Sequence, residues 1–500
     1  MRNGVEISMT HTVQREKCFL GIDVGTTTIK AVICDRNARV LAQANRHCPT
    51  ISPDLGRHEQ EARLWQLYSV EVVRSALKDL PSGYSVVALS LSTQGGTMVP
   101  LNADFQPLRN AVLWKDASCA EDLAMIESIL PPGYVYQQTG WSPYRGLNLL
   151  QIMRLRRENP DLFNATRYFA SVPDYMNYYL CGRFAADYSN AGINQLGDVV
   201  NKVWDNKLLQ QAGVTVKQLP ELVDSGTALG TLTPQAAEDL GLSTDVQVVA
   251  GGHDQNCVAL GCGAILPGST SIGSGTAWVV LAVTEDQERL SKGGFSFSRH
   301  VIDDTWTSMI SLSTGGTYLE WWRNRLVAAP ELPPFDLIDA QVEDSLDLAD
   351  ELLFVPNSRY SFTGAHNLPQ GATFLGLDEK HQAYDLARAI MEGVAFQALL
   401  NLQRLNNGWP ERITFTGGAT KSPIWPDIVA AAADRPLILP EVKDSGAYGA
   451  ALLAGIGTGY FNNLEELSDM LIRRGTVIEP QPDRWTNTVR RFALYREINN

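Results

Sequence analysis

The sequence has no stretch rich in lysine and arginine, and its 55 acidic residues outnumber the 41 basic ones, giving a net charge of −14. A surface that follows a nucleic-acid backbone needs clustered positive charge, so we expect no nucleic-acid partner. No apolar run approaches the ~18 residues of a membrane-spanning helix, and residues 1–17 lack the apolar centre of a signal peptide. These absences predict a cytoplasmic protein that does not enter a membrane.

The sequence also lacks the cysteine patterns typical of disulfide frameworks and zinc sites. Its seven cysteines are an odd number scattered along the chain, and Cys257 and Cys262 do not have CxxC spacing. We therefore expect reduced thiols packed in the core.

Nothing in the composition indicates disorder, because hydrophobic residues make up 44% and charged residues 19% of the 500 residues. A chain of this length exceeds one ordinary core, so two large domains are expected. Pro267 and Gly268 interrupt the pattern of predicted elements. This places the boundary near residue 265 and predicts domains over 16–265 and 266–490.

The hydrophobic pattern predicts an α/β fold, and its first half begins with a meander. Strand-like runs at 18–24, 29–35 and 39–45 are followed by an amphipathic helix over 64–76 and a buried strand at 86–92. The order of elements in this half is therefore three strands, a helix and a strand.

A similar order recurs in the second half, which indicates an internal duplication. Residues 268–284 indicate two strands around a turn, 305–313 a third strand and 316–326 a helix, before helices and strands alternate over 381–457. Only the order of elements repeats, since the residues of the two halves barely match outside the turns. An acidic segment, 331–351, has eight acidic residues and no basic ones, and we interpret it as a solvated helical face or surface insert.

The sequence has no GxxxxGK[ST] motif, the signature of a P-loop. The segment 417–422, Gly-Gly-Ala-Thr-Lys-Ser, comes nearest but lacks the glycine before its lysine. A phosphate site therefore has to be built from other turns.

The turns of the two meanders offer the required chemistry, with Gly25-Thr26-Thr27-Thr28 in the first half and Gly273-Ser274-Gly275-Thr276 in the second. Glycines let the backbone approach a ligand, and successive N–H groups with hydroxyls favour phosphate oxygens. Two such turns facing each other would enclose a triphosphate. Asp23 needs a cation between itself and a phosphate, so it is a candidate Mg²⁺ ligand, and Lys30 would add positive charge. By itself the first turn is equally typical of an ordinary hairpin.

A third stretch, 248–264, runs from a strand through two glycines to His253 and Asp254 and then into an apolar helix. A carboxylate at the end of a strand and beside a helix start can accept a proton from a substrate hydroxyl, as phosphoryl transfer requires. Asp254 is thus a candidate general base, with helix N-capping as the competing interpretation. His253 would either orient Asp254 or pack in the core.

With these stretches in place, the chain resembles the FGGY family of carbohydrate kinases, within the actin-like ATPase superfamily. The resemblance covers residues from about 18 to 475 and rests on an ordered set of motifs. They are DVGTTTIKAVICD (23–35), STQGGTMVPLN (92–102), LWKDASC (113–119), DYSNAG (187–192), GGHDQNCVALGCGA (251–264), SIGSGTAW (271–278), FLGL (374–377), MEGVAFQ (391–397) and FTGGATKSPIWPDIVA (415–430).

The resemblance implies two ribonuclease H-like domains with a catalytic cleft between them, binding ATP and Mg²⁺. It makes Asp254 the base that deprotonates the sugar and Asp23 the carboxylate near the metal. The implied nucleotide-binding residues are Gly25, Thr26, Thr27, Lys30, Gly275, Thr276, Gly417, Gly418 and Ser422, the last at the start of a helix beside the adenine. The implied sugar-binding residues are Gln94, Gly95 and Asp116, together with Asp254.

The chain departs from the family pattern around the sugar, where Gln151 and Arg154 stand in place of the usual lysine and tryptophan. We expect an ATP-dependent kinase of a small ketose, such as a pentulose or a deoxyhexulose. The alternatives are a kinase of a polyol such as glycerol or a pentitol, a non-kinase actin-like ATPase, and a sugar-sensing regulator, which would need a DNA-binding module that the chain leaves no room for. The expected partner is a small sugar or polyol, with the oligomeric state open between monomer and homodimer.

Overall fold

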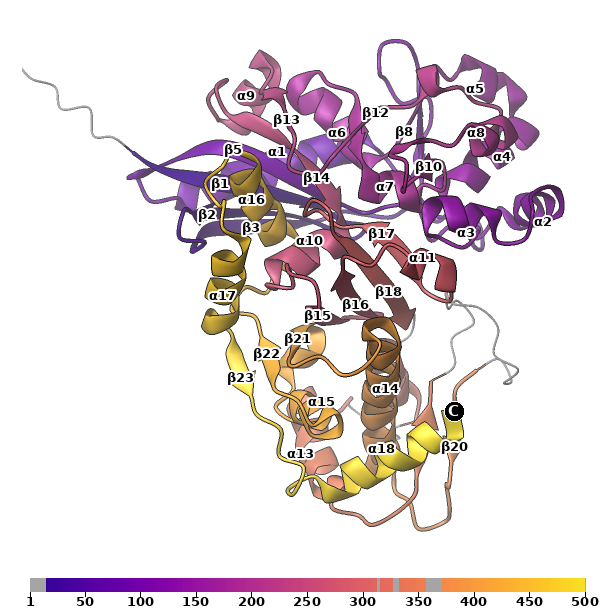
Figure 1. Cartoon of the computed structure of the whole chain (residues 1–500), viewed down its shortest axis with the longest axis vertical. Coiled ribbons are helices and arrows are strands. Elements are labelled where there is room, and N and C mark those ends of the chain that lie inside the picture. Colours follow the sequence, from indigo (N-terminus) through magenta and orange to yellow (C-terminus); the bar gives the residue numbers. More distant parts are fainter. Residues whose placement is uncertain (1–14, 313–314, 327–331, 357–370, 500) are drawn as a thin grey trace, which may run out of the picture.

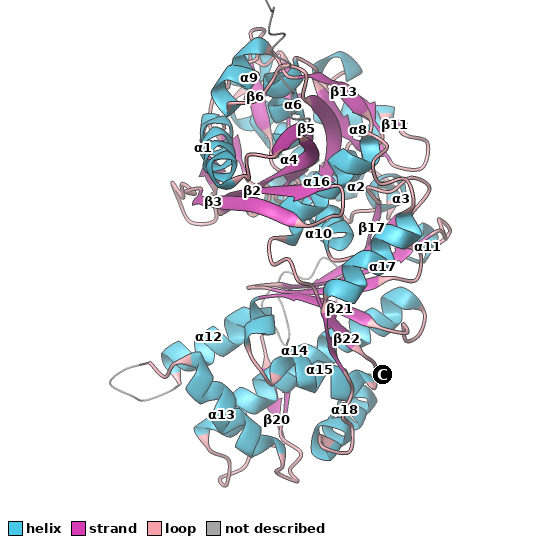
Figure 2. Ribbon diagram, turned by 90° about the vertical axis from the view of Figure 1, so that its left-hand side faces the viewer, coloured by secondary structure: helices cyan, strands magenta, loops and turns pink. Residues whose placement is uncertain are grey.

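The computed structural model of the chain describes residues 15–312, 315–326, 332–356 and 371–499. Residues 1–14, which include most of the polar N-terminal segment, lie outside the described part, as do Ser313 and Glu331 at the ends of two predicted segments. The molecule has two lobes, each built around one large β-sheet with helices on its faces (Figures 1 and 2).

The sheet of the first lobe has six strands in the order β13-β14-β5-β1-β2-β3. Its strands are β1 (Glu16–Val24), β2 (Thr28–Asp35), β3 (Val40–His47), β5 (Tyr84–Thr93), β13 (Ala228–Thr231) and β14 (Gln247–His253). The first three form the predicted antiparallel meander, and β5 and β14 then add in parallel to β1. The carboxyl ends of β1, β5 and β14 therefore meet at one edge of the sheet.

The sheet of the second lobe has seven strands in the order β17-β18-β16-β15-β21-β22-β23. Its strands are β15 (Thr270–Ser274), β16 (Trp278–Thr284), β17 (Ser296–Arg299), β18 (Trp306–Leu312), β21 (Ile413–Gly417), β22 (Leu437–Leu439) and β23 (Thr476–Ile478). An antiparallel meander of β15, β16 and β18 is again extended by two parallel strands, β21 and β22. The predicted duplication is confirmed as a repeat of topology.

Each lobe carries further elements around its sheet. In the first lobe these are α1 (Arg63–Asp79), α2 (Ala120–Ile129), α3 (Tyr134–Thr139), α4 (Asn148–Glu158), α5 (Pro160–Ala165), α6 (Val172–Cys181), α7 (Tyr188–Ile193), α8 (Asn206–Ala212), α9 (Pro234–Leu240), α10 (Asp254–Gly261) and the short strands β4 (Glu59–Gln60), β6 (Val99–Leu101), β7 (Ala111–Val112), β8 (Tyr168–Ala170), β9 (Ala185–Asp187), β10 (Gly197–Asp198), β11 (Val203–Trp204) and β12 (Glu221–Val223). Beyond β15 they are α11 (Arg289–Lys292), α12 (Gly315–Arg325), α13 (Phe335–Leu346), α14 (Ala383–Asn406), α15 (Trp425–Ala433), α16 (Ser445–Gly457), α17 (Leu464–Arg474), α18 (Thr486–Asn499), β19 (Leu353–Val355) and β20 (Thr373–Leu375).

Helix α16 packs on the sheet of the first lobe, although it follows the last parallel strand of the second (Figure 1). Its sequence, SGAYGAALLAGIG, is apolar on nearly every side, and most of it is buried. At two glycines, α16 approaches its neighbours so closely that a side chain would not fit. A Cβ on Gly21 of β1 would lie 1.8 Å from the Ala447 carbonyl oxygen, and one on Gly449 would lie 1.9 Å from that of Cys257 in α10. Helices α10 and α16 thus cross between the lobes with their backbones in contact. The domain boundary near residue 265 stays a prediction.

The acidic segment is more integrated than the interpretation as a solvated insert implied. Helix α13 buries Ile338 and Val342, as an amphipathic helix does. Two carboxylates of the acidic segment have specific partners: Asp339 of α13 accepts a hydrogen bond from the Ser422 hydroxyl, and Asp350, beyond the end of α13, pairs with Arg388 at 2.8 Å. Part of the acidic charge therefore stabilises the second lobe.

All seven cysteines are unpaired, and all but the half-buried Cys181 are buried. Burial raises the pKa of the Cys48 thiol to about 11, so it stays protonated at neutral pH. Within the described ranges, no helix has the length and hydropathy that crossing a bilayer requires.

Candidate active site

The hairpin between β1 and β2 presents Asp23 and the three threonines at the edge where parallel strands end. The Ser92 hydroxyl at the end of β5 donates a 2.7 Å hydrogen bond to Asp23 Oδ1. Burial raises the pKa of Asp23 to about 6, against the opposing effect of that hydrogen bond, and the negative charge of Asp254 raises it further. Gly446, in the first turn of α16, leaves room for the carboxylate, since a Cβ there would lie 3.3 Å from Asp23 Oδ2.

Asp254 is the first residue of α10 and follows β14 directly. Its side chain is 31% exposed, and Oδ1 lies 3.2 Å from His253 Nε2. The competing interpretation as an N-cap does not hold, because His253 occupies the cap position and no side chain caps this helix. His253 is fixed by its backbone N–H, which donates to the Ser189 hydroxyl, and by the edge of the Trp141 ring. A partly exposed carboxylate is thus held by a buried imidazole.

The hairpin between β15 and β16 forms the corresponding turn of the second lobe. Gly275 and Thr276 are exposed at its tip, while the Ser274 hydroxyl is buried and donates to the Thr416 carbonyl at 2.6 Å. Ser274 lies in register with Gly417, whose φ of +103° and close approach to the Ser274 backbone (2.8 Å from an added Cβ) leave space for glycine alone. This turn therefore presents backbone groups and the side chain of the exposed Thr276.

The resemblance implied that Ser422 begins a helix, but the structure places Ser422 before the helix. Helix α15 starts at Trp425, after a short 3₁₀ turn over Gly418–Lys421. The Ser422 hydroxyl donates to Asp339 and accepts from the Trp425 N–H at 3.1 Å. It thus accepts a hydrogen bond from a backbone N–H in the first turn of α15, as helix-capping hydroxyls do.

Lys30 lies beside the first hairpin but forms an ion pair with Asp444, 2.9 Å away at the start of α16. Burial acts to lower the pKa of Lys30, but the hydrogen bond and charge of Asp444 outweigh it and raise the pKa. The pair fastens the hairpin to the crossing helix. The predicted role of Lys30 toward phosphate remains a prediction.

The residues predicted to bind sugar lie in the first lobe and are already hydrogen-bonded to protein. Gln94 is 1% exposed, and its amide bonds to Gln60 and Thr26. Asp116 is 2% exposed and accepts from the backbone N–H groups of His58 and Ser118, each at 2.9 Å. Both side chains hold the surrounding loops in place, and their contact with sugar stays a prediction.

Several residues of the site were not predicted as such from the sequence. Gln151, noted only as a departure from the family pattern, places its amide nitrogen 2.5–3.2 Å from the carbonyl oxygens of Gly96, Leu113 and Gly146. Gln60 and Trp141 were not identified at all, and Ser92 and Trp114 were included in family motifs without a role of their own. Ser92, at the end of a buried apolar strand, offered a signal, whereas Gln60 stands between Glu59 and Glu61 and offered none.

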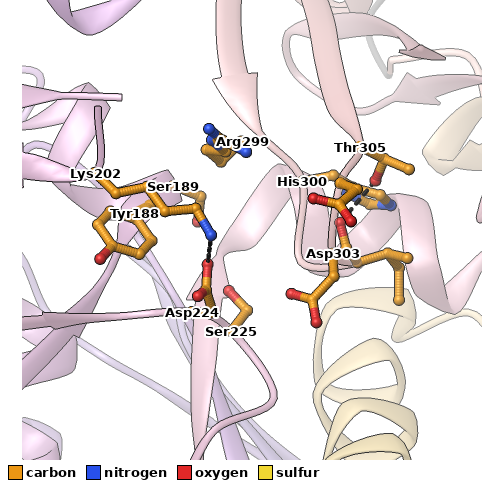
Figure 3. A pocket seen from close by; sticks show the side chains of 11 residues that line it. Tyr188, Ser189, Lys202, Asp224, Ser225, Arg299, His300, Asp303 and Thr305 are labelled. Carbon is orange, nitrogen blue, oxygen red and sulfur yellow. Dashed lines mark hydrogen bonds and ion pairs between the residues drawn. The ribbon is translucent and has the colours of Figure 1, made fainter. Parts of the chain in front are cut away.

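A small pocket lies between the first lobe and the connection from β17 to β18 (Figure 3). The ion pair of Lys202 and Asp224 lines one side, and Asp303 lies across from it. The pocket borders Ser189, the residue that receives the hydrogen bond from His253. It therefore lies next to the end of β14.

Strand β17 and the connection after it fasten the second lobe to the first beside this pocket. The Arg299 guanidinium donates to the carbonyls of Val199 and Val200 and stacks on the Trp306 ring, 4.0 Å from its centroid. The Phe297 N–H donates to the Gly140 carbonyl at 2.8 Å. The lobes are thus joined both here and at the crossing of α10 and α16.

Comparison with known proteins tests the resemblance. The model of the FGGY family of carbohydrate kinases matches with its N-terminal domain over residues 18–261 and with its C-terminal domain over 270–458. The chain belongs to the FGGY family of carbohydrate kinases. The predicted family is therefore confirmed, and the protein is a carbohydrate kinase that uses ATP to phosphorylate a sugar.

Members of the FGGY family match along nearly the whole chain. Xylulose kinase of Bacillus subtilis (strain 168) is 29% identical over 490 residues, covering 96% of each chain. Autoinducer-2 kinase of Escherichia coli (strain K12) is 28% identical over 516 residues, covering 95% of this chain and 92% of its own. The crystal structure of xylulose kinase from Rhodospirillum rubrum superimposes with a TM-score of 0.86 at 23% identity, covering 96% of this chain and 99% of its own. The predicted two-domain α/β fold is confirmed.

Proposed function

We propose that this protein transfers the γ-phosphoryl group of ATP to a hydroxyl of a small ketose, a pentulose or a deoxyhexulose, with Asp254 as general base. The observation that carries the proposal is the placement of Asp254. Its carboxylate is partly exposed at the carboxyl end of β14, held by His253, and electrostatically coupled to Asp23 on the first hairpin. A base in that position can take the proton of an acceptor hydroxyl while the hydroxyl oxygen attacks the γ-phosphorus in line.

The two hairpins and the start of the turn before α15 would hold the triphosphate. On the first-lobe side, Gly25 and the exposed Thr27 offer an N–H and a hydroxyl, and on the second-lobe side Gly275 and Thr276 offer the same groups. Gly417 and Gly418 are exposed and would lie along the nucleotide. Donors that are fixed before the reaction stabilise charge on the transferring phosphoryl group without further reorganisation.

The chemistry of the donors fits a magnesium ion shared between protein and nucleotide. Within the described ranges, no three His, Cys, Asp or Glu side chains come together as a metal cluster. Mg²⁺ is commonly bound by one or two carboxylates, with water and substrate phosphates completing the shell, and Asp23 supplies such a carboxylate. When bound there, the ion would neutralise charge on the phosphate oxygens.

The sugar class is inferred from the relatives and from the surroundings of Asp254. Several of the relatives that match along nearly the whole chain are xylulose kinases. Trp114, Trp141 and Ile193 form an apolar wall near Gly95, where an added Cβ would lie 2.6 Å from Ile193. A compact wall of this kind suits a small acceptor better than a large one.

The test is ADP release from Mg-ATP across a panel of pentuloses, hexuloses, 6-deoxyketoses, pentitols and glycerol. We expect strong stimulation by one ketose, and a loss of roughly 10²- to 10⁴-fold in kcat for Asp254→Asn with unchanged melting temperature. Asp224→Asn, in the neighbouring pocket, is the matched control and should retain turnover. Stimulation by a polyol alone would correct the substrate class, and a fully active Asp254→Asn would refute the general base. Light scattering on the same sample decides between monomer and homodimer.

A further inference from the structure

The three threonines of the first hairpin differ in what their hydroxyls contact. Thr27 is exposed, and none of the described residues forms a hydrogen bond with its hydroxyl, whereas Thr28 already belongs to β2. The Thr26 hydroxyl is bonded twice: it donates to Gln94 Oε1 at 2.8 Å and accepts from the Trp114 indole N–H at 2.9 Å. Both bonds direct the Thr26 hydroxyl toward Gln94 and toward Trp114 of the apolar wall, here called the sugar wall. The hydroxyl is therefore already engaged by protein, although Thr26 was predicted to bind phosphate.

The backbone of Thr26 is held by the same group of side chains. Gln60 Nε2 donates to the Thr26 carbonyl at 2.6 Å, and Gln94 Nε2 donates to Gln60 Oε1 at 3.0 Å. The Gln94 backbone N–H also donates to the carbonyl of Val24, in the same hairpin. Hairpin and wall are thus connected through both side-chain and main-chain bonds.

Burial makes it costly for any hydrogen bond of this network to break. Gln60 is fully buried and Gln94 is 1% exposed. Polar groups without access to water lose much when a partner moves away, so the members of such a network shift together or not at all.

The far end of the network lies in the wall proposed to contact sugar. Trp114 packs with Trp141 and Ile193 of the first lobe and with Met309 of β18 in the second. Gln94 precedes Gly95, where an added Cβ would lie 2.8 Å from the His253 ring. A displacement of Trp114 or Gln94 by a bound acceptor would therefore be transmitted to the hairpin, and the reverse.

We propose that Thr26 is a positioning residue that couples the nucleotide site to the acceptor site through Gln94 and Trp114, and that Thr27 is the hairpin threonine that contacts phosphate. The inference rests on the proposed function for the identity of the acceptor, but not for the response to nucleotide. Coupling between two ligands is reciprocal, so nucleotide binding also acts on Trp114.

The first experiment uses nucleotide alone. In protein labelled with ¹⁵N at its indoles, with the Trp114 resonance assigned by its loss in Trp114→Phe, saturating Mg-ADP is added without acceptor. The Trp114 resonance should shift in the native protein and in Thr26→Ser, and should not respond in Thr26→Val. Thr27→Val, the matched control, should need more Mg-ADP but show the full shift at saturation. An unresponsive Trp114 in the native protein would overturn the proposal.

The second experiment measures the coupling itself. The affinity for Mg-ADP is determined with and without D-xylulose, or with whichever acceptor stimulates ADP release most. We expect a ratio of about fivefold or more in the native protein, close to one in Thr26→Val and Trp114→Phe, and restored in Thr26→Ser. Thr27→Val should weaken both affinities and keep the ratio, which a purely structural role for Thr26 would not predict.

The two experiments separate failure of the proposal from failure of the proposed substrate. An unchanged ratio in Thr26→Val refutes the coupling even if the kinase reaction is established. If no acceptor stimulates ADP release, the substrate class is wrong, and the indole response still decides whether Thr26 connects hairpin and wall. Should Thr26→Val not fold, Trp114→Phe removes the same hydrogen bond while keeping an aromatic ring.

Discussion

The two hairpin turns proposed to hold the nucleotide share a topology but differ in their partners. The turn of the first lobe has a carboxylate, Asp23, and a threonine, Thr26, that is bonded to the sugar wall. The turn of the second lobe has no charged residue, and its packing is made by backbone. A Cβ on Gly316 of α12 would lie 2.6 Å from the Gly275 carbonyl oxygen.

This difference shows how a duplicated element can take on two tasks. Asp23 and Thr26 connect the first turn to groups that we propose to take part in catalysis and acceptor binding. The second turn lies between β21 and α12, where small residues allow close backbone approach. We infer that the first turn organises the reaction and the second holds the nucleotide.

The largest effect is expected from a substitution that breaks the backbone packing of the second turn. Gly417 has φ +103° and ψ −163°, a region that costs other residues about 1–3 kcal/mol, and its added Cβ would meet the Ser274 backbone. Gly417→Ala should lower the melting temperature and raise the KM for ATP by about tenfold or more. Thermal melts and ATP titrations measure both effects.

Gly418→Ala is the matched control for that substitution, since its Cβ would lie at an ordinary 3.5 Å from the Ser274 carbonyl oxygen. It should behave nearly as the native protein does. Equal damage from both substitutions would contradict the backbone argument.

The comparison of the two turns can be sharpened by placing the same methyl group on each. A Cβ on Gly25 would lie 2.9 Å from the Thr28 carbonyl oxygen, whereas one on Gly275 would lie 3.5 Å from that of Ala277. Gly25→Ala should therefore lower kcat/KM for ATP by about tenfold, corresponding to ~1.4 kcal/mol, and Gly275→Ala by much less. Steady-state kinetics at saturating acceptor decide this, and the reverse order would remove the distinction between the turns.

The smallest effect concerns the charge that only the first turn carries. Because burial raises the pKa of Asp23 from its ordinary 3.8 to about 6, folding favours the protonated acid, and ionised Asp23 costs stability above pH 6. Asp23→Asn should therefore stabilise the protein without nucleotide or metal at pH 7.5 and raise its melting temperature.

The pH dependence of that gain follows from the same pKa. At pH 4, close to the ordinary pKa of 3.8, Asp23 is protonated in the folded state and partly protonated in the unfolded state, so the difference in melting temperature should shrink steeply between pH 6 and pH 4. Melting curves in EDTA at pH 7.5, 6 and 4.5 measure it. A gain that is constant across this range would exclude Asp23 ionisation as its cause. In the kinase assay the same variant should lose activity.

Local patterns in the sequence were sufficient to predict both meanders and the position of Asp254 between a strand and a helix. Alternating apolar residues end at glycine and threonine in each hairpin, and the strand before Asp254 breaks at two glycines, so these signals lie within a few neighbouring residues. The predicted strands at 18–24 and 29–35 match β1 and β2 to within two residues.

Long-range partners could not be predicted in this way. The pairing of Lys30 with Asp444, and of Gln94 with Thr26 and Gln60, joins segments that no short-range pattern connects. The apolar sequence of α16 predicted a buried helix but not the sheet that it covers, since burial on all sides fits either lobe.

The return of α16 to the first sheet has a consequence for biosynthesis. One face of that sheet, with Phe19, Val32 and Ala88, is covered by α10 together with α16 and the segment after it. Strand β1 is synthesised well before α16, because most strands of both sheets lie between them in the sequence. The nascent first lobe therefore keeps part of an apolar face uncovered until α16 has been made and can pack on it.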